Sequence, residues 1–334
     1  MTTLPTTTPM TTPMTTVTTP RTAPTTAPTT ATPQTDVTVP PLPETPMTMP
    51  ETATILSPAQ MAKAAEDAAF AKATSSPLKS FLLGLTAGGY IALGFIFYTT
   101  SQVGAQDLPF GVAKLIGGLA FSTGLALVVL TGAELFTSST LTLTARASGR
   151  ITWGQLLRNW VIVYAANFVG ALTMAALVYL GGTWHSANGG WGKVVLATSA
   201  LKLHHTFGEA FVLGILCNLM VCLAVWAAYS GRTTTDKVVA VTMPIALFVA
   251  SGFEHSVANM FMLPLGILIK DTAGADFWSA TGLHASDFAD LTWTHFLSGN
   301  LLPVTLGNIV GGGIMIGIFY WTVFHLLDGH QAKA

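Results

Sequence analysis

The sequence SGFEHSVANMFM, residues 251–262, lies inside an otherwise apolar stretch that runs from about residue 238 to residue 270. A single helix needs only ~20 residues to cross a bilayer core, so this stretch is too long for one plain crossing. Near its centre Gly252 is closely followed by Glu254 and His255. A broken helix is the simplest interpretation.

Five other apolar stretches are long enough to span a membrane. One of them is also too long for a plain crossing, and it contains the sequence GAELFT at residues 132–137, again with a glycine shortly before a carboxylate. The sequence therefore predicts an all-α integral membrane protein with six transmembrane helices, of which helices 2 and 5 are broken. The six stretches run approximately over residues 78–100, 110–145, 155–181, 206–230, 238–270 and 300–326.

The two halves of this pattern repeat each other. Gly132-Ala133-Glu134-Leu135 in the second stretch matches Gly252-Phe253-Glu254-His255 in the fifth, and the third and sixth share Asn-x-Val-Gly at residues 167–170 and 308–311. Because each half has an odd number of spans, the second half is inverted relative to the first. The sequence thus predicts two inverted three-helix repeats whose breaks meet near the membrane midplane and line a pore, since irregular backbone at that depth needs protein or water to bond it.

Composition excludes several classes of function. Charged residues make up only 9% of the chain, apolar residues make up 51%, and the net charge is −1, so no basic surface is available for nucleic acid. Neither break carries an NPA motif, which argues against a water channel, and no GxxxxGK[ST] loop is present to drive an ATP-dependent pump. With no Ser-His-Asp grouping in one predicted site, we expect neither an enzyme nor a bound cofactor.

Four segments are predicted along the chain. Residues 1–56 are a Thr/Pro-rich tail expected to be disordered, residues 57–77 an interfacial helix that Ser57 can cap, residues 78–326 the six-helix channel domain, and residues 327–334 a short C-terminus. Lys and Arg are more numerous on one side of the predicted membrane, which places both termini in the cytoplasm. That side collects nine residues against four, namely Lys63, Lys72, Lys79, Arg146, Arg150, Arg158, Arg232, Lys237 and Lys333 against Lys114, Lys193, Lys202 and Lys270.

His255 is the strongest candidate for a functional residue, because an ionisable side chain at a helix break inside the membrane is costly to keep. A histidine satisfied by a neighbouring helix is the structural alternative. Glu134 and Glu254 lie beside the starts of the second half-helices, where we expect the carboxylates to accept backbone N–H bonds left free by the breaks. A proton relay is the other interpretation of these two carboxylates.

Three further polar residues have two interpretations each. Asn218 and Asn259 lie within spans, and each could bond the histidine or brace the helix break. Lys202 precedes the fourth span at the non-cytoplasmic mouth, where a lone cation could concentrate anions or simply be solvated. The neighbouring His204 and His205 point apart on a helix and have no cysteine nearby, so we expect no metal site.

Five segments of the chain resemble the formate-nitrite transporter family, and the resemblance covers about residues 57–326. The segments are GAELFT at 132–137, ASGRITW at 147–153, KLHHTF at 202–207, SGFEHSVANMFM at 251–262 and NLLPVTLGNIVGGG at 300–313. The resemblance implies an aquaporin-like fold in a bacterial inner membrane, assembled as a homopentamer in which each protomer has its own pore. It also implies that the N-terminal segment takes part in gating and contacts a cytoplasmic formate-producing enzyme, although the tail of about 56 residues departs from the family pattern.

The resemblance assigns roles to matching residues. His255 matches the central pore histidine, Thr137 the threonine that hydrogen-bonds it, and Lys202 the vestibule lysine. Two apolar constrictions on either side of the histidine are implied at Phe121, Leu125, Leu135 and Phe248, and polar support at Asn218, Glu254 and Asn259.

The expected function is transport of formate and related small monovalent anions, with His255 exchanging a proton with the substrate near the midplane. A nitrite or hydrosulfide channel of the same family is the main alternative. A plain anion channel with a permanently charged His255 and a membrane scaffold that recruits a cytoplasmic partner are the others.

Overall fold

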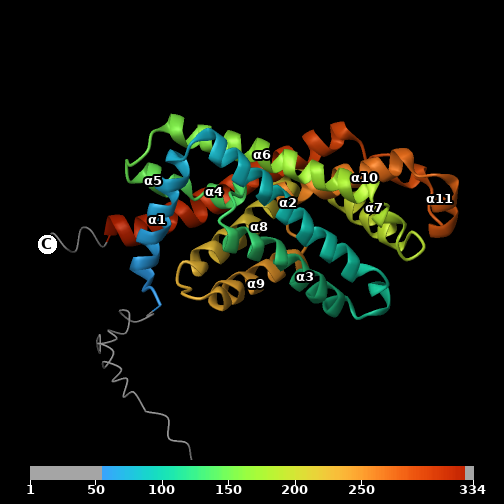
Figure 1. Ribbon diagram of the computed structural model, residues 1–334, viewed down its shortest axis with the longest axis horizontal. Helices are drawn as coiled ribbons and strands as arrows, with labels where there is room; N and C mark the ends of the chain where they lie inside the picture. The colour runs from blue at the N-terminus through green and yellow to red at the C-terminus, as the bar shows by residue number, and fades with distance from the viewer. Residues whose placement is uncertain (1–54, 328–334) are drawn as a thin grey trace, which may run out of the picture. The chain divides into compact units, whose positions relative to one another are not determined.

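The computed structural model describes residues 55–327, and every regular element in this part of the chain is a helix (Figure 1). The predictions for residues 1–54 and for the C-terminal residues 328–334 lie outside the described residues. The α-helices are α1 (Pro58–Thr74), α2 (Pro77–Gln102), α3 (Phe110–Thr131), α4 (Phe136–Ser139), α5 (Thr142–Ala147), α6 (Trp153–Leu180), α7 (Gly190–Leu203), α8 (Phe207–Ala228), α9 (Thr234–Ala250), α10 (Ser256–Thr272), α11 (Ala275–Thr281), α12 (Leu302–Asn308) and α13 (Phe319–Trp321).

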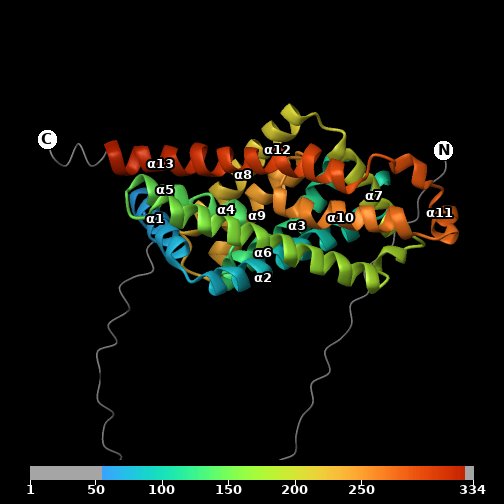
Figure 2. The same cartoon turned by 90° about the horizontal axis from the view of Figure 1, so that it is seen from above.

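Five helices among the described residues are long and apolar enough to cross a membrane. They are α2, α3, α6, α8 and the C-terminal rod His295–Leu327, in which π-helical turns join α12 and α13 (Figure 2). Large apolar side chains are exposed along these helices, for example Val161 on α6 and Phe319 on the rod. Such surface is suited to lipid or to another subunit rather than to water.

The stretch from 238 to 270 forms two helices of 17 residues each, α9 and α10, instead of one long helix. Gly252 adopts a left-handed conformation with φ 74°, and the chain is extended at His255 before α10 begins at Ser256. The stretch from 110 to 145 is interrupted in the same way: Gly132, with φ 73°, ends α3 and α4 begins at Phe136. A glycine is favoured at both places because a side chain strains left-handed backbone.

Glycines also allow the helices of each repeat to approach closely. A Cβ atom at Gly170 of α6 would collide with the Leu85 carbonyl of α2, and a Cβ at Gly311 of the rod would collide with the Ile215 carbonyl of α8. These contacts pack α2 against α6 and α8 against the rod, at the glycines of the two Asn-x-Val-Gly sequences. Small residues let membrane helices approach closely, and this close packing stabilises their association where lipid weakens the hydrophobic effect between them.

Helix α7 was not predicted from the sequence. It has 14 residues and carries Lys193 and Lys202, so it is too short and too polar to have been recognised as a span. It packs against α10, with the Ser199 hydroxyl donating to the Met262 carbonyl at 3.1 Å. Its last turn places Lys202 inside the bundle, whereas the sequence predicts this residue at the mouth of the pore.

Helix α1 begins after Ser57, whose side chain caps it, and is held to the loop before α6 by ion pairs. Arg150 contacts Asp67 at 2.7 Å and Glu66 at 3.1 Å, and its guanidinium lies 4.7 Å from the centre of the Phe70 ring. Hydrogen bonds from Arg150 and Lys63 hold the pKa of Asp67 below its ordinary value of 3.8. A lowered carboxyl pKa means that this link stabilises the docked helix above about pH 4 and is lost as the pH falls through the lowered value.

The Arg150→Gln variant is therefore expected to loosen α1 at neutral pH. Amide hydrogen exchange of residues 58–74, followed by mass spectrometry at pH 7, should become faster than in the unmodified protein. Lys63→Gln is the matched control, since the Lys63 side chain is 78% exposed and pairs only with Asp67 among the described residues. Equal exchange in Arg150→Gln and Lys63→Gln would show that the ion pairs of Arg150 do not hold the helix.

Candidate functional site

His255 lies at the junction of α9 and α10 and is 2% exposed. Its Nδ1 atom accepts a hydrogen bond from the Ala258 N–H at 3.0 Å, so the imidazole acts as the N-terminal cap of α10. Its Nε2 atom lies 3.2 Å from the Thr137 hydroxyl of α4. Because Nδ1 must be unprotonated to accept the backbone bond, this bonding assigns the ring proton to Nε2, which donates to Thr137. His255 and Thr137, 118 residues apart, are thus in direct contact.

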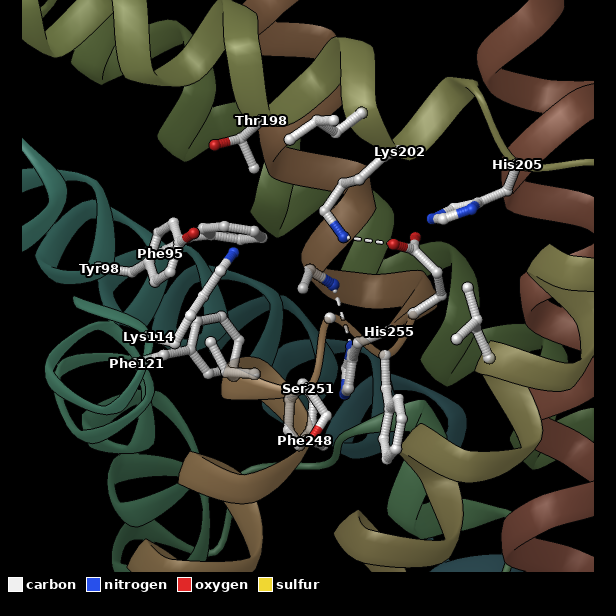
Figure 3. A pocket seen from close by; sticks show the side chains of 17 residues that line it. Phe95, Tyr98, Lys114, Phe121, Thr198, Lys202, His205, Phe248, Ser251 and His255 are labelled. Carbon is white, nitrogen blue, oxygen red and sulfur yellow. Dashed lines mark hydrogen bonds and ion pairs between the residues drawn. The ribbon is translucent and has the colours of Figure 1, made fainter. Parts of the chain in front are cut away.

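A cavity of about 350 Å³ opens onto the histidine (Figure 3). The Phe248 ring stacks on the His255 ring with 5.9 Å between their centres, and Phe121 meets Phe248 edge-on at 5.6 Å. The floor of the cavity therefore combines one imidazole with two phenyl rings. The residues around it are Phe95, Tyr98, Lys114, Phe121, Thr198, Leu201, Lys202, His205, Leu213, Phe248, Val249, Ser251, Gly252, Phe253, Glu254, His255 and Ala258.

The two leucines expected at constrictions are buried and do not line this cavity. Leu125 is 1% exposed and lies one turn along α3 from Phe121, while Leu135 is fully buried immediately before α4. A second cavity, of about 220 Å³, begins one turn further along α3. Along α3, Leu125 thus lies between Phe121 of the first cavity and Val128 of the second. The second cavity is lined by Ala68, Lys72, Val128, Val129, Gly132, Ala133, Ser138, Val225, Ala228, Tyr229 and Lys237.

Asparagine amides bond the backbone where the helices restart. The Asn308 Oδ1 accepts from the Ser256 N–H at 2.9 Å, and its Nδ2 donates to the Gly214 and Glu254 carbonyls at 2.8 and 3.0 Å. In the first repeat the Asn167 Oδ1 accepts from the Phe136 N–H at 2.8 Å, and its Nδ2 donates to the Gly84 and Glu134 carbonyls at 2.7 and 3.0 Å. One side chain in each repeat therefore satisfies three buried backbone groups.

This arrangement corrects the prediction that Glu134 and Glu254 cap the second half-helices. Within the described residues neither carboxylate accepts a backbone N–H; the asparagines of the Asn-x-Val-Gly pairs and the His255 ring do so instead. The Glu254 carboxylate accepts from Lys202 at 2.8 Å, from Asn259 at 2.7 Å and from Asn300 at 3.2 Å. The sequence identifies Asn167 and Asn308 only as matching positions of its two halves, because each lies far along the chain from the N–H group that it caps.

Lys202 is not the lone cation at the mouth that the sequence suggested. Its side chain is 14% exposed, and its ammonium is paired with Glu254 beside the cavity (Figure 3). A buried carboxylate nearby favours such pairing, because each charge offsets the desolvation of the other. The pair leaves little net charge at this point of the cavity.

Lys72, at the end of α1, is the counterpart of Lys202 and was not recognised from the sequence as a site residue. The Asn159 amide donates to the Lys72 carbonyl at 3.2 Å, as the Asn300 amide donates to the Lys202 carbonyl at 3.0 Å. The side chains differ, since the Lys72 ammonium donates to the Ser138 hydroxyl at 3.1 Å rather than to a carboxylate. Lys72 lines the second cavity.

Asn218 and Asn259 brace the breaks and make no hydrogen bond to His255 within the described residues. The Asn218 amide donates to the Thr137 and Asn308 carbonyls, at 3.0 and 2.6 Å. The Asn259 amide donates to Glu254 and, at 2.7 Å, to Asn300. Over residues 55–327 no group of three or more His, Cys, Asp or Glu side chains could hold a metal ion.

Replacing Asn308 with Ala is expected to destabilise the fold strongly. The change leaves a buried N–H and two carbonyls without this partner, at a cost of about 2 to 5 kcal/mol in the free energy of unfolding. The melting temperature in detergent should fall by roughly 5 °C or more. Ser298→Ala, which removes an exposed hydroxyl bonded only to the Thr294 carbonyl, is the control and should melt like the unmodified protein.

The pair of Lys202 and Glu254 is expected to behave as a unit. Lys202→Gln leaves the Glu254 carboxylate, whose side chain is 2% exposed, without its counter-ion and should cost about 3 to 5 kcal/mol. The double variant Lys202→Gln with Glu254→Gln should recover most of that loss in thermal unfolding. A double variant no more stable than Lys202→Gln alone would contradict the coupling.

The family model of formate/nitrite transporters matches residues 59–322. The chain is 55% identical over 277 residues to the formate channel FocA of Escherichia coli strain K12, covering 83% of this chain and 97% of that one. It is 54% identical over 272 residues to FocA of Haemophilus influenzae, covering 81% and 96%.

Two solved structures share the fold. A pentameric formate channel with formate bound superposes with a TM-score of 0.71 at 50% identity, covering 74% of this chain and 97% of that chain. An ion channel of the same family gives 0.64 at 30% identity, covering 80% and 98%. The relatives described here are channels, not enzymes. The chain is thus an all-helical integral membrane protein and belongs to the formate/nitrite transporter family.

Proposed function

We propose that this protein conducts formate and related small monovalent anions across the membrane through the two cavities and the apolar segment between them. Its relatives at 54–55% identity are named formate channels, and one similar solved structure has formate bound. The observation that carries the proposal is the contact of buried His255 with Thr137 at the foot of a cavity that also contains Lys202. The polar His255 ring at the apolar end of the cavity lets a small anion replace hydrogen bonds to water with hydrogen bonds to the protein.

The proposed architecture has six crossings in two inverted three-helix repeats. The broken second crossing consists of α3 with α4 and α5, and the broken fifth of α9 with α10. The matched bonds of Asn167 and Asn308 support the repeat. We propose a homopentamer by analogy with the pentameric relative, and cytoplasmic termini from the distribution of Lys and Arg.

The domain divisions and the cytoplasmic formate-producing partner stay predictions of the sequence and the resemblance. The tail that would carry that contact falls mostly outside residues 55–327.

A bare anion meets a large barrier at the apolar segment. Moving a charge past Phe121, Leu125 and Phe248 costs several kcal/mol even with partial hydration, and each 1.4 kcal/mol slows passage about tenfold. A neutral acid avoids most of this cost. We therefore propose that a proton moves from the imidazolium form of His255 to a carboxylate oxygen of formate, after which formic acid crosses and the histidine is reprotonated.

The cap on α10 makes this proton transfer conditional. In the bonded arrangement the ring is neutral, and its Nε2 proton cannot be given up to formate because that would leave an imidazolate. The imidazolium forms only when Nδ1 takes a proton and releases the Ala258 N–H. Protonation of the histidine is thus linked to opening one hydrogen bond at the start of α10, and lower pH should favour both steps.

His255→Phe tests the role of the histidine while keeping an aromatic ring of similar size. In liposomes we expect formate flux to rise as the pH falls in the unmodified protein. In His255→Phe, flux should lose its histidine-dependent rise and be reduced roughly tenfold or more at low pH. The variant must first be shown to assemble like the unmodified protein, by native mass spectrometry, which also tests the pentamer.

Two outcomes would overturn parts of this proposal. Flux with an unchanged pH dependence in His255→Phe would remove the histidine from the mechanism. Absence of formate flux in the unmodified protein, together with flux of nitrite or hydrosulfide, would assign the channel to another small anion.

A further inference from the structure

Lys114 is a half-buried lysine that lines the His255 cavity and has no role in the mechanism above. It lies near the start of α3, and its ammonium is 5.5 Å from the centre of the Phe110 ring. Figure 3 shows its side chain extending toward the side of the cavity formed by Phe95 and Tyr98. Within residues 55–327 no carboxylate pairs with it, whereas Lys202 in the same cavity is bound to Glu254.

The charge of this cavity therefore depends on Lys114. The positive charge of Lys202 and the negative charge of Glu254 offset each other at 2.8 Å, and Glu254 is the only acidic residue lining the cavity in the described part of the chain. Apart from the two histidines, Lys114 is the one charged side chain lining this cavity that has no ion-pair partner among the described residues. An approaching anion is attracted mainly by that charge, because a tightly paired ion has a field that falls off quickly.

The opposite cavity contains a lysine in a similar place. Lys237 lies near the start of α9, as Lys114 lies near the start of α3, and it is also half-buried. The helices α3 and α9 pack together in opposite directions: the start of α3 and the end of α9 line one cavity, and the end of α3 and the start of α9 line the other. Among the described residues no Asp or Glu lines the second cavity, and Lys237 has no ion-pair partner.

We propose that Lys114 and Lys237 are outer capture residues for small monovalent anions, one at each opening of the pathway. This inference rests on the proposed function and adds to it a first step of anion recruitment that precedes contact with Lys202 or Lys72. Their ammonium groups raise the local anion concentration and so the rate of arrival. The barrier to passage is assigned to the apolar segment, so we expect these lysines to leave the rate at saturation unchanged.

The position of each lysine makes the effect directional. Lys114 serves anions that arrive from the side of Lys202, and Lys237 serves anions that arrive from the side of Lys72. A change at one opening should alter uptake from that side at low anion concentration and leave uptake from the other side nearly unaltered. A lysine that is merely solvated at the membrane surface would show no such preference.

The test uses liposomes in which the full-length protein has one orientation, with initial rates of formate uptake measured from each side. In Lys114→Gln the formate concentration for half-maximal rate should rise about threefold to tenfold from the Lys202 side, the effect of one unit charge at roughly 6 to 8 Å in a partly aqueous cavity. Lys237→Gln should give the same rise from the Lys72 side. The maximal rates should stay within about twofold.

Matched controls separate capture from general charge. Lys193→Gln removes a cation of α7 whose ammonium donates to the Thr281 carbonyl and does not line the cavity, and Lys79→Gln removes an exposed cation at the start of α2. Both should leave the half-maximal concentrations unchanged. Lys114→Arg should restore the unmodified value, and the defect of Lys114→Gln should shrink between 10 and 150 mM salt because the Debye length falls from about 30 to about 8 Å.

The outcomes distinguish this inference from the function on which it rests. If the unmodified protein conducts formate and Lys114→Gln has unchanged half-maximal concentrations on both sides, the capture role is wrong while the channel function stands. A loss of maximal rate with an unchanged half-maximal concentration would also overturn it. If the unmodified protein conducts no formate, the proposed function itself fails.

Discussion

The structure depends on how buried backbone groups are bonded where helices stop and restart inside the bundle. An unbonded N–H or carbonyl in an apolar interior costs several kcal/mol, so an interrupted helix persists only with dedicated partners. Asn167 and Asn308 provide these partners, each joining a restarting helix to two neighbouring segments. The interruption in turn brings Thr137 and His255 together, and it gives the cavity a polar end.

The two repeats that we propose share this scaffold and differ in the side chains that face the proposed pathway. Leu135 of the first repeat is fully buried among apolar residues, whereas His255 at the matching place caps α10 and lines a cavity. The lysines differ as well: Lys202 binds a carboxylate and Lys72 binds a hydroxyl. The matched asparagine bonds thus support an unmatched set of groups, so the two directions of the proposed passage are chemically distinct.

Much of this could be predicted from the sequence, because apolar length and glycine placement are local signals. The apolar stretches at α2, α6 and α8 and the turns at Gly132 and Gly252 were predicted from the sequence and are present in the structure. The partners of the buried side chains could not be predicted in this way. The contact of Lys202 with Glu254 depends on α7, which is too short to be recognised as a span. The caps supplied by Asn167 and Asn308 were not predictable for a similar reason, because each asparagine lies far along the chain from the N–H group that it bonds.

On the proposed pathway, the ion pair of Lys202 and Glu254 affects how long an anion stays bound. The Glu254 carboxylate is bonded to the Lys202 ammonium at 2.8 Å. A formate ion that binds this ammonium must displace a carboxylate of similar chemistry, so its net gain in binding free energy is small. Such exchange lowers the affinity of the site without removing its selectivity for negative charge. A pathway must release what it binds, and weak, shared binding shortens the dwell time at each step. On the proposed pathway, Glu254 therefore favours rapid release of the anion over tight binding.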